Sequence, residues 1–190
     1  MSRPGRAFVI SGPSGVGKDA VIEKLVEADP NLERSVSFTT RRPRAMEKDG
    51  VDYSFVSRED FQRLIDSGEL LEHATYDGNL YGTSARRVER LRSAGHDVIL
   101  KIDVKGAEQV REKLPQATYI FLAPPSMQEL LRRTTQRQTE SAEDRSARQM
   151  IAETEMKYAS QYDHVVVNDD LDKAVRDVLD IIRGVRARKT

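Results

Sequence analysis

A glycine-rich segment near the start of the chain has the residue types and spacing of a phosphate-binding loop. The apolar run Phe8-Val9-Ile10-Ser11 precedes it, and Val21, Ile22 and Leu25 follow at helical spacing. The predicted order is therefore strand, turn and helix. Glycines let the backbone curl so that N–H groups converge, and the helix N-terminus adds partial positive charge. The turn, which suits a polyphosphate, reads G-x-x-x-x-G-K and consists of Gly12, Pro13, Ser14, Gly15, Val16, Gly17 and Lys18.

The residue after the loop lysine departs from the usual pattern. Such a loop normally continues with Ser or Thr, whose hydroxyl ligates Mg²⁺, whereas this chain has Asp19. A carboxylate also binds a hard cation, but it brings negative charge beside phosphates. We therefore expect Mg²⁺ as the cofactor and Asp19 as its ligand.

Two other segments concentrate arginine. Three of the residues 41–44 are arginines, with Pro43 stiffening the turn, and such a group can surround one phosphate. The residues 126–148 form a helix-loop-helix pattern with many arginines and little apolar surface, which predicts a lid that closes over phosphates. A solvated basic loop and a charged surface hairpin are the respective alternatives.

Composition limits the class of protein. The 190 residues suit one domain, and 31 basic side chains balance 31 acidic ones, so no overall charge recruits nucleic acid or a membrane surface. The chain has no cysteine and no apolar run of about eighteen residues. We expect a cytoplasmic protein whose partners bind at local sites, and its oligomeric state stays open.

The elements that must position these residues alternate along most of the chain. After the first helix, which should end near Ala28, short strands around a small helix at residues 57–68 predict an inserted α+β lobe. From Ser84 onward, apolar strands at 97–103, 117–122 and 164–167 alternate with helices. The pattern predicts an α/β fold whose parallel sheet is covered on both faces, with ligands at the carboxyl ends of its strands.

A phosphate loop, a second arginine cluster and an arginine-bearing lid together describe a kinase for a small phosphorylated acceptor. Phosphoryl transfer needs donor and acceptor in line, water excluded and positive charge around the transferring group. On this interpretation Lys18 holds the β- and γ-phosphates of the donor, and Arg41 and Arg44 hold the phosphate of the acceptor.

The chain resembles the guanylate kinase family over nearly its whole length. The resemblance implies ATP:GMP phosphotransfer on a three-layer P-loop fold, with a core of 1–34, 84–125 and 149–190, a GMP-binding lobe of 35–83 and a lid of 126–148. Small molecules, ATP and GMP, would then be the partners. The matching residues are Gly12–Lys18, Ser35–Ser37, Thr39–Arg41, Pro43–Arg44, Asp52–Tyr53, Phe55–Val56, Glu72, Gly78–Asn79, Tyr81–Thr83, Ile102–Asp103, Gly106, Ala123–Ser126 and Val167–Asp170.

The resemblance also implies roles for individual residues. The loop residues through Asp19, together with Asn168, would bind ATP. The catalytic set would combine Lys18 and Arg41 with the lid arginines Arg133, Arg137 and Arg148. The GMP phosphate would lie among Arg41, Arg44, Tyr53 and Tyr81, and the guanine end would be contacted or oriented by Glu72, Thr83 and Asp103.

The chemistry of Glu72 agrees with this assignment. Guanine presents adjacent N1–H and N2–H donors, and one carboxylate can accept both, whereas adenine would set a lone pair against it. A buried polar mismatch of this kind rejects the wrong base by about 10⁴-fold in sites of similar design. GMP is therefore the expected acceptor.

Four residues depart from the pattern of the family: Asp19, Phe38, Lys101 and Gln138. Asp19 stands where Ser or Thr is usual, and Lys101 where Asp is usual. We hypothesise a coupled exchange in which the carboxylate has moved to the loop and Lys101 offsets its charge; separate tolerance of the two substitutions is the alternative. Two other functions stay open, a catalytically impaired binding module and a kinase for another phosphorylated acceptor such as a ribose phosphate.

Overall fold

The structure, a computed structural model, describes residues 3–135 and 142–188, with the backbone alone for residues 134–135 and 142–148. Its strands are β1 (Ala7–Ser11), β2 (Leu32–Arg34), β3 (Phe38–Thr39), β4 (Ser54–Phe55), β5 (Leu70–Tyr76), β6 (Asn79–Ser84), β7 (Asp97–Lys101), β8 (Thr118–Ala123) and β9 (His164–Val167). Its helices are α1 (Lys18–Ala28), α2 (Arg58–Asp66), α3 (Ala85–Ser93), α4 (Val104–Lys113), α5 (Met127–Thr135), α6 (Ala142–Lys157), the short 3₁₀ helix η1 (Tyr158–Gln161) and α7 (Leu171–Ala187).

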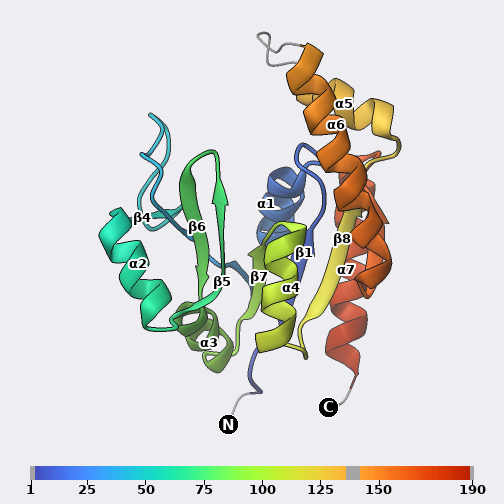
Figure 1. The fold of residues 1–190 in the computed structure, drawn as a ribbon. Coiled ribbons are helices and arrows are strands. Elements are labelled where there is room, and N and C mark those ends of the chain that lie inside the picture. The colour runs from blue at the N-terminus through green and yellow to red at the C-terminus, as the bar shows by residue number, and fades with distance from the viewer. Residues whose placement is uncertain (1–2, 136–141, 189–190) are drawn as a thin grey trace. The chain divides into compact units, whose positions relative to one another are not determined.

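These strands form two sheets (Figure 1). The five-stranded sheet has the order β2-β7-β1-β8-β9, and its pairs β2 with β7, β1 with β8, and β8 with β9 are parallel. The four-stranded sheet has the order β4-β3-β6-β5, with β6 antiparallel to both β3 and β5. The predicted α/β fold with a parallel central sheet is confirmed.

The chain divides into two compact units. Unit 1 comprises Asn31–Leu100 and Lys105–Ala117 together with the first residues as far as Ala7. Unit 2 comprises Phe8–Pro30, Lys101–Val104 and the chain from Thr118 onward. The partition into core, lobe and lid that the sequence suggests stays a prediction.

Buried apolar strands form the centre of unit 2. Every residue of β1 is buried, and Tyr119 through Ala123 of β8 are buried as well, which is typical of parallel strands covered on both faces. Helix α7 packs against α1, and two ion pairs join them: Lys24 Nζ to Asp172 Oδ1 at 2.6 Å, and Arg186 Nη1 to Asp29 Oδ2 at 2.5 Å, with Asp29 directly after α1.

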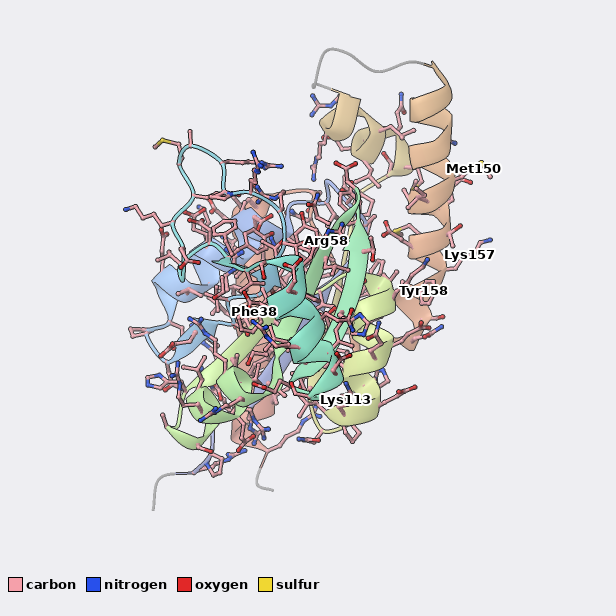
Figure 2. The ribbon with its side chains drawn as sticks, turned by 60° about the vertical axis from the view of Figure 1, so that its left-hand side comes forward. Phe38, Arg58, Lys113, Met150, Lys157 and Tyr158 are labelled. Carbon is pink, nitrogen blue, oxygen red and sulfur yellow. The ribbon has the colours of Figure 1, made fainter. Side chains whose placement is uncertain are left out.

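Helix α6 continues into η1 along the same unit. Figure 2 shows Met150 and Lys157 on α6 and Tyr158 at the start of η1. Met150 is exposed, whereas Tyr158 packs against the cluster that contains Phe121 and Ala123 of β8. Among the residues that the structure describes, no helix is long and apolar enough to span a membrane.

Capping side chains begin helices α2 and α3 of unit 1. The Ser57 hydroxyl accepts a hydrogen bond from the Asp60 N–H at 3.0 Å, and the Ser84 hydroxyl accepts one from the Arg87 N–H at 3.1 Å. The predicted helix at residues 57–68 is confirmed as α2. Its Phe61 is fully buried against β6, where a Cβ on Gly82 would approach the ring to 3.0 Å.

Candidate functional site

Glycine conformations and a tight fit shape the predicted phosphate loop, which lies in unit 2 between β1 and α1. Gly12, Gly15 and Gly17 have φ angles of 142°, 83° and 99°, which residues with a Cβ rarely adopt. A Cβ on Gly12 would also lie 2.2 Å from the Leu122 carbonyl oxygen. Backbone geometry thus favours glycine at all three positions, and close approach also requires it at Gly12.

The ammonium of Lys18 turns back onto this loop. Lys18 Nζ donates to the Gly12 carbonyl at 2.5 Å and to the Pro13 carbonyl at 3.0 Å. Burial lowers the pKa of Lys18 to about 8, and the neighbouring charge of Glu155 partly offsets that effect. Phosphate oxygens would favour the charged form of this buried lysine, because they add negative charge beside its ammonium.

Asn168 braces the loop from the end of β9. Its side chain is buried, and Nδ2 donates to the Val16 carbonyl at 2.8 Å. A Cβ on Gly17 would lie only 2.5 Å from the same Nδ2 atom. The amide of Asn168 thus holds the backbone of the loop in place, and its predicted part in ATP binding stays a prediction.

Arg133 of α5 contacts the same corner of unit 2. Its Nη1 donates to the Asn168 carbonyl at 3.0 Å, and its Nε donates to Glu129 Oε1 at 2.8 Å. Arg132 and Arg133 together lower the pKa of Glu129 to about 2. Of the other predicted lid arginines, Arg137 lies outside the described residues, and Arg148 lies in α6 with its side chain outside them.

Asp19 and Lys101 form an ion pair beside the loop. Lys101 Nζ lies 2.6 Å from Asp19 Oδ1, with the Lys101 side chain 21% and the Asp19 side chain 71% exposed. The expected charge offset is therefore present, although the exposure of Asp19 keeps its contribution to stability at about 1 kcal/mol or less. Asp103, two residues beyond Lys101, is exposed in unit 2, and its charge raises the pKa of Lys18.

The described residues contain no group of three His, Cys, Asp or Glu side chains that could hold a metal ion by themselves. Mg²⁺ bound with a nucleotide takes one or two carboxylates and completes its shell with phosphates and water. Asp19, in the first turn of α1 next to Lys18, is a carboxylate whose chemistry fits such an ion.

Arg41 is the centre of the predicted phosphate site in unit 1. Its Cζ lies 5.5 Å from the ring centroid of Tyr53. A hydrogen bond to Glu47, and to a lesser extent one to Tyr81, raises the pKa of Arg41. The Tyr53 and Tyr81 rings meet edge to face, with centroids 5.9 Å apart. Three of the four residues predicted around the GMP phosphate are thus in one cluster, and the fourth, Arg44, is exposed nearby in the same loop.

The Glu47 carboxylate accepts hydrogen bonds from two residues of this loop. Its Oε1 accepts from Arg41 Nη2 at 2.8 Å, and its Oε2 accepts from the Arg44 backbone N–H at 2.8 Å. The Arg41 and Glu47 side chains are both only 17% exposed. Sequence reasoning missed Glu47, although a carboxylate just after an arginine cluster is the available signal.

Glu72 and Thr83 form a buried polar pair on neighbouring strands. They are direct partners in the register of β5 and β6, and the Thr83 hydroxyl donates to Glu72 Oε1 at 2.6 Å. Glu72 is 6% and Thr83 1% exposed. A carboxylate has about four lone-pair sites and can accept several hydrogen bonds at once.

Comparison with known proteins shows the family of the chain. The sequence pattern of the guanylate kinase family matches residues 4–185. A guanylate kinase of Alkalilimnicola ehrlichii is 46% identical over 185 residues, covering 97% of this chain and 91% of that protein. One of Desulfitobacterium hafniense is 46% identical over 184 residues, covering 97% and 92%. The chain belongs to the guanylate kinase family.

A solved structure of this family agrees with the fold. The crystal structure of guanylate kinase from Anaplasma phagocytophilum superposes with a TM-score of 0.80 at 35% identity, covering 99% of this chain and 89% of that one. The resemblance seen in the sequence is therefore confirmed over nearly the whole length of the chain. For this guanylate kinase family member, the roles of individual residues remain predictions.

The lowered pKa of Lys18 predicts that nucleotide binding takes up a proton at alkaline pH. Bound phosphates raise the pKa of Lys18, and with a free value of about 8 the binding of ADP at pH 8.5 should take up ~0.7 proton. The Kd for ADP should accordingly rise as the pH increases above 8. Titration calorimetry without Mg²⁺, in buffers of different ionisation enthalpy, measures the uptake. Equal uptake by the Lys18→Met variant would contradict this origin.

Proposed function

We propose that this chain transfers the γ-phosphoryl group of ATP to GMP, giving ADP and GDP. Its membership of the guanylate kinase family, at 46% identity over 97% of the chain, supports the reaction. The observation that carries the choice of acceptor is the buried Glu72 carboxylate held by Thr83. That carboxylate accepts both N1–H and N2–H of guanine, whereas adenine offers it an acceptor instead.

Residues of unit 2 bind ATP. The loop from Gly12 to Gly17 surrounds the phosphates with backbone N–H groups, and Lys18 exchanges its carbonyl partners for β- and γ-phosphate oxygens. Asn168 keeps the loop in shape through Val16. Arg133, Arg137 and Arg148, in the segment proposed as a lid, place positive charge around the transferring group.

Residues of unit 1 bind GMP. Arg41, Arg44, Tyr53 and Tyr81 bind its phosphate, which replaces the Glu47 carboxylate at the Arg41 guanidinium. Glu72 and Thr83 bind the guanine base; Asp103, a residue of unit 2, is proposed to orient it. Because phosphoryl transfer involves little covalent chemistry by the protein, these contacts act by position and charge.

Mg²⁺ is the proposed cofactor, and Asp19 is its proposed protein ligand. The ion neutralises charge on the β- and γ-phosphates when it is bound. Lys101 pairs with Asp19 in the structure, so the two residues together determine the charge at the ligand position.

A double-mutant cycle tests whether Asp19 and Lys101 act as a unit. We expect Asp19→Ser and Lys101→Asp each to lower kcat/KM for ATP, since one leaves Lys101 without this carboxylate and the other sets two carboxylates together. The kcat/KM of the double variant should be about tenfold higher than the two single effects combined would give, a typical coupling for residues in contact. Activities are measured across a Mg²⁺ titration. Additive losses would show that the two substitutions are independent.

Product analysis tests the proposed reaction. Incubation with ATP and GMP should form ADP and GDP in equal amounts, and ribose 5-phosphate should neither accept phosphate nor compete with GMP. Phosphorylation of ribose 5-phosphate would favour a kinase for a different acceptor. Binding of GMP without any GDP would indicate a binding module.

A further inference from the structure

Strand β5, which carries Glu72, is irregular where this residue lies. It pairs with β6 through Leu70 opposite Ser84 and Glu72 opposite Thr83, and the register shifts between them. Leu70, Leu71 and Glu72 are all buried, whereas side chains of a regular strand alternate between two faces. Such a bulge changes the direction of the side chains that follow it. The aim of the Glu72 carboxylate therefore depends on how this bulge is held.

The bulge lies on a strand with a sheet neighbour on one side. In the four-stranded sheet β5 occupies the end of the order, next to β6. Backbone N–H and C=O groups on the other side of such a strand need partners from outside the sheet. Two side chains of α4 in the same unit supply them.

Gln109 pairs with the residue directly after Glu72. Its Oε1 accepts the His73 N–H at 3.2 Å, and its Nε2 donates to the His73 carbonyl at 3.1 Å. A carboxamide that satisfies both backbone groups of one residue imitates a neighbouring strand. Because both groups of His73 point toward α4, a shift of β5 by one residue would break both bonds and turn Glu72 to the other face.

Lys113 pairs with the residue before the bulge. Its Nζ donates to the Leu70 carbonyl at 2.8 Å, and Figure 2 shows it at the end of α4. Gln109 and Lys113 are four residues apart, so they lie on one face of the helix. One helix face thus holds the backbone on both sides of the bulge.

We propose that Gln109 and Lys113 are positioning residues for guanine recognition, which hold the β5 bulge so that the Glu72 carboxylate meets the N1–H and N2–H of the acceptor base. This role rests on the proposed binding of GMP by Glu72. Neither side chain has to touch the substrate, and their effect passes through the backbone of Leu70 and His73.

Kinetics of Gln109→Leu and Lys113→Met test this role. Leu has nearly the size of Gln but can make neither hydrogen bond, so KM for GMP should rise about tenfold, the effect of losing one to two neutral bonds. KM for ATP should stay unchanged. The preference for GMP over IMP should narrow, because inosine lacks the N2 amino group and uses only part of the carboxylate. Lys113→Met should show the same pattern at about threefold, since Lys113 is an exposed residue.

Three further variants separate positioning from stability. Glu108→Gln changes an exposed residue of the same helix and should behave as wild type. Lys113→Arg keeps a donor for the Leu70 carbonyl and should restore KM for GMP. Gln109→Glu keeps the acceptor for the His73 N–H. If Gln109→Leu does not fold, KM for GMP is measured with this variant instead.

A lower Tm for Gln109→Leu with KM for GMP and the GMP-to-IMP ratio both within twofold of wild type would overturn the proposal, because the contacts would then serve stability alone. If the wild-type protein showed no preference for GMP over IMP, that result would instead contradict the recognition of guanine by Glu72.

Discussion

Replacement of Glu72 by Gln should lower kcat/KM for GMP by about 10³-fold or more, because a buried amide sets its own N–H₂ against the donors of guanine. The Glu72 carboxylate is 6% exposed and accepts the Thr83 hydroxyl at 2.6 Å, so the variant keeps the size of the side chain and loses its charge. KM for ATP should change little. Steady-state kinetics with GMP and ATP varied in turn measures both effects.

Glu69→Gln provides the matched control for this prediction. Glu69 is exposed one residue before β5 and should tolerate the same chemical change. If Glu72→Gln retained GMP activity within threefold of wild type, while AMP remained a poor acceptor, the base would have to be selected by other residues.

Replacement of Lys18 by Met should lower kcat/KM for ATP by about 10²- to 10³-fold, the effect of removing one preorganised donor from a developing charge. Met has a similar length but no charge, so the phosphates lose their cation. The Gly12 and Pro13 carbonyls also lose the donor that they share, at 2.5 Å and 3.0 Å. Single-turnover kinetics with saturating GMP isolates the transfer step.

Lys24→Met is the matched control for Lys18→Met. Lys24 lies on the same helix and pairs with Asp172 on the surface of unit 2. Thermal unfolding of both variants shows whether the loop has loosened. Equal activity losses in the two variants, or a loss that follows Tm alone, would contradict a direct role of Lys18 in phosphate binding.

Local patterns made the phosphate loop and most elements predictable. The phosphate loop is recognised from its glycine spacing before Lys18 with a strand before it and a helix after it. The hydroxyls of Ser57 and Ser84 cap their helices by hydrogen bonds to residues only three positions away. The charge pairing of Asp19 with Lys101 was also predictable, because a parallel sheet brings the end of one strand to the loop after another.

Features that depend on distant contacts were not predictable. Strands β2 and β3 have only three and two residues, too few for any periodicity, and they exist through their pairing with β7 and with β6. The hydrogen bonds between Asn168 and Val16 and between Gln109 and His73 join residues remote in the sequence. Polar side chains at such positions look like ordinary surface residues until the fold brings their partners near.

The most direct test of the central claim is an assay of ADP formation from ATP with GMP, AMP, CMP or UMP as acceptor, repeated across a Mg²⁺ titration. We predict turnover with GMP, poor turnover with the other three, and saturation at ordinary Mg²⁺ concentrations despite Asp19 at the ligand position. Comparable turnover with AMP, or GMP binding without turnover at any Mg²⁺ concentration, would contradict the proposed ATP:GMP phosphotransfer.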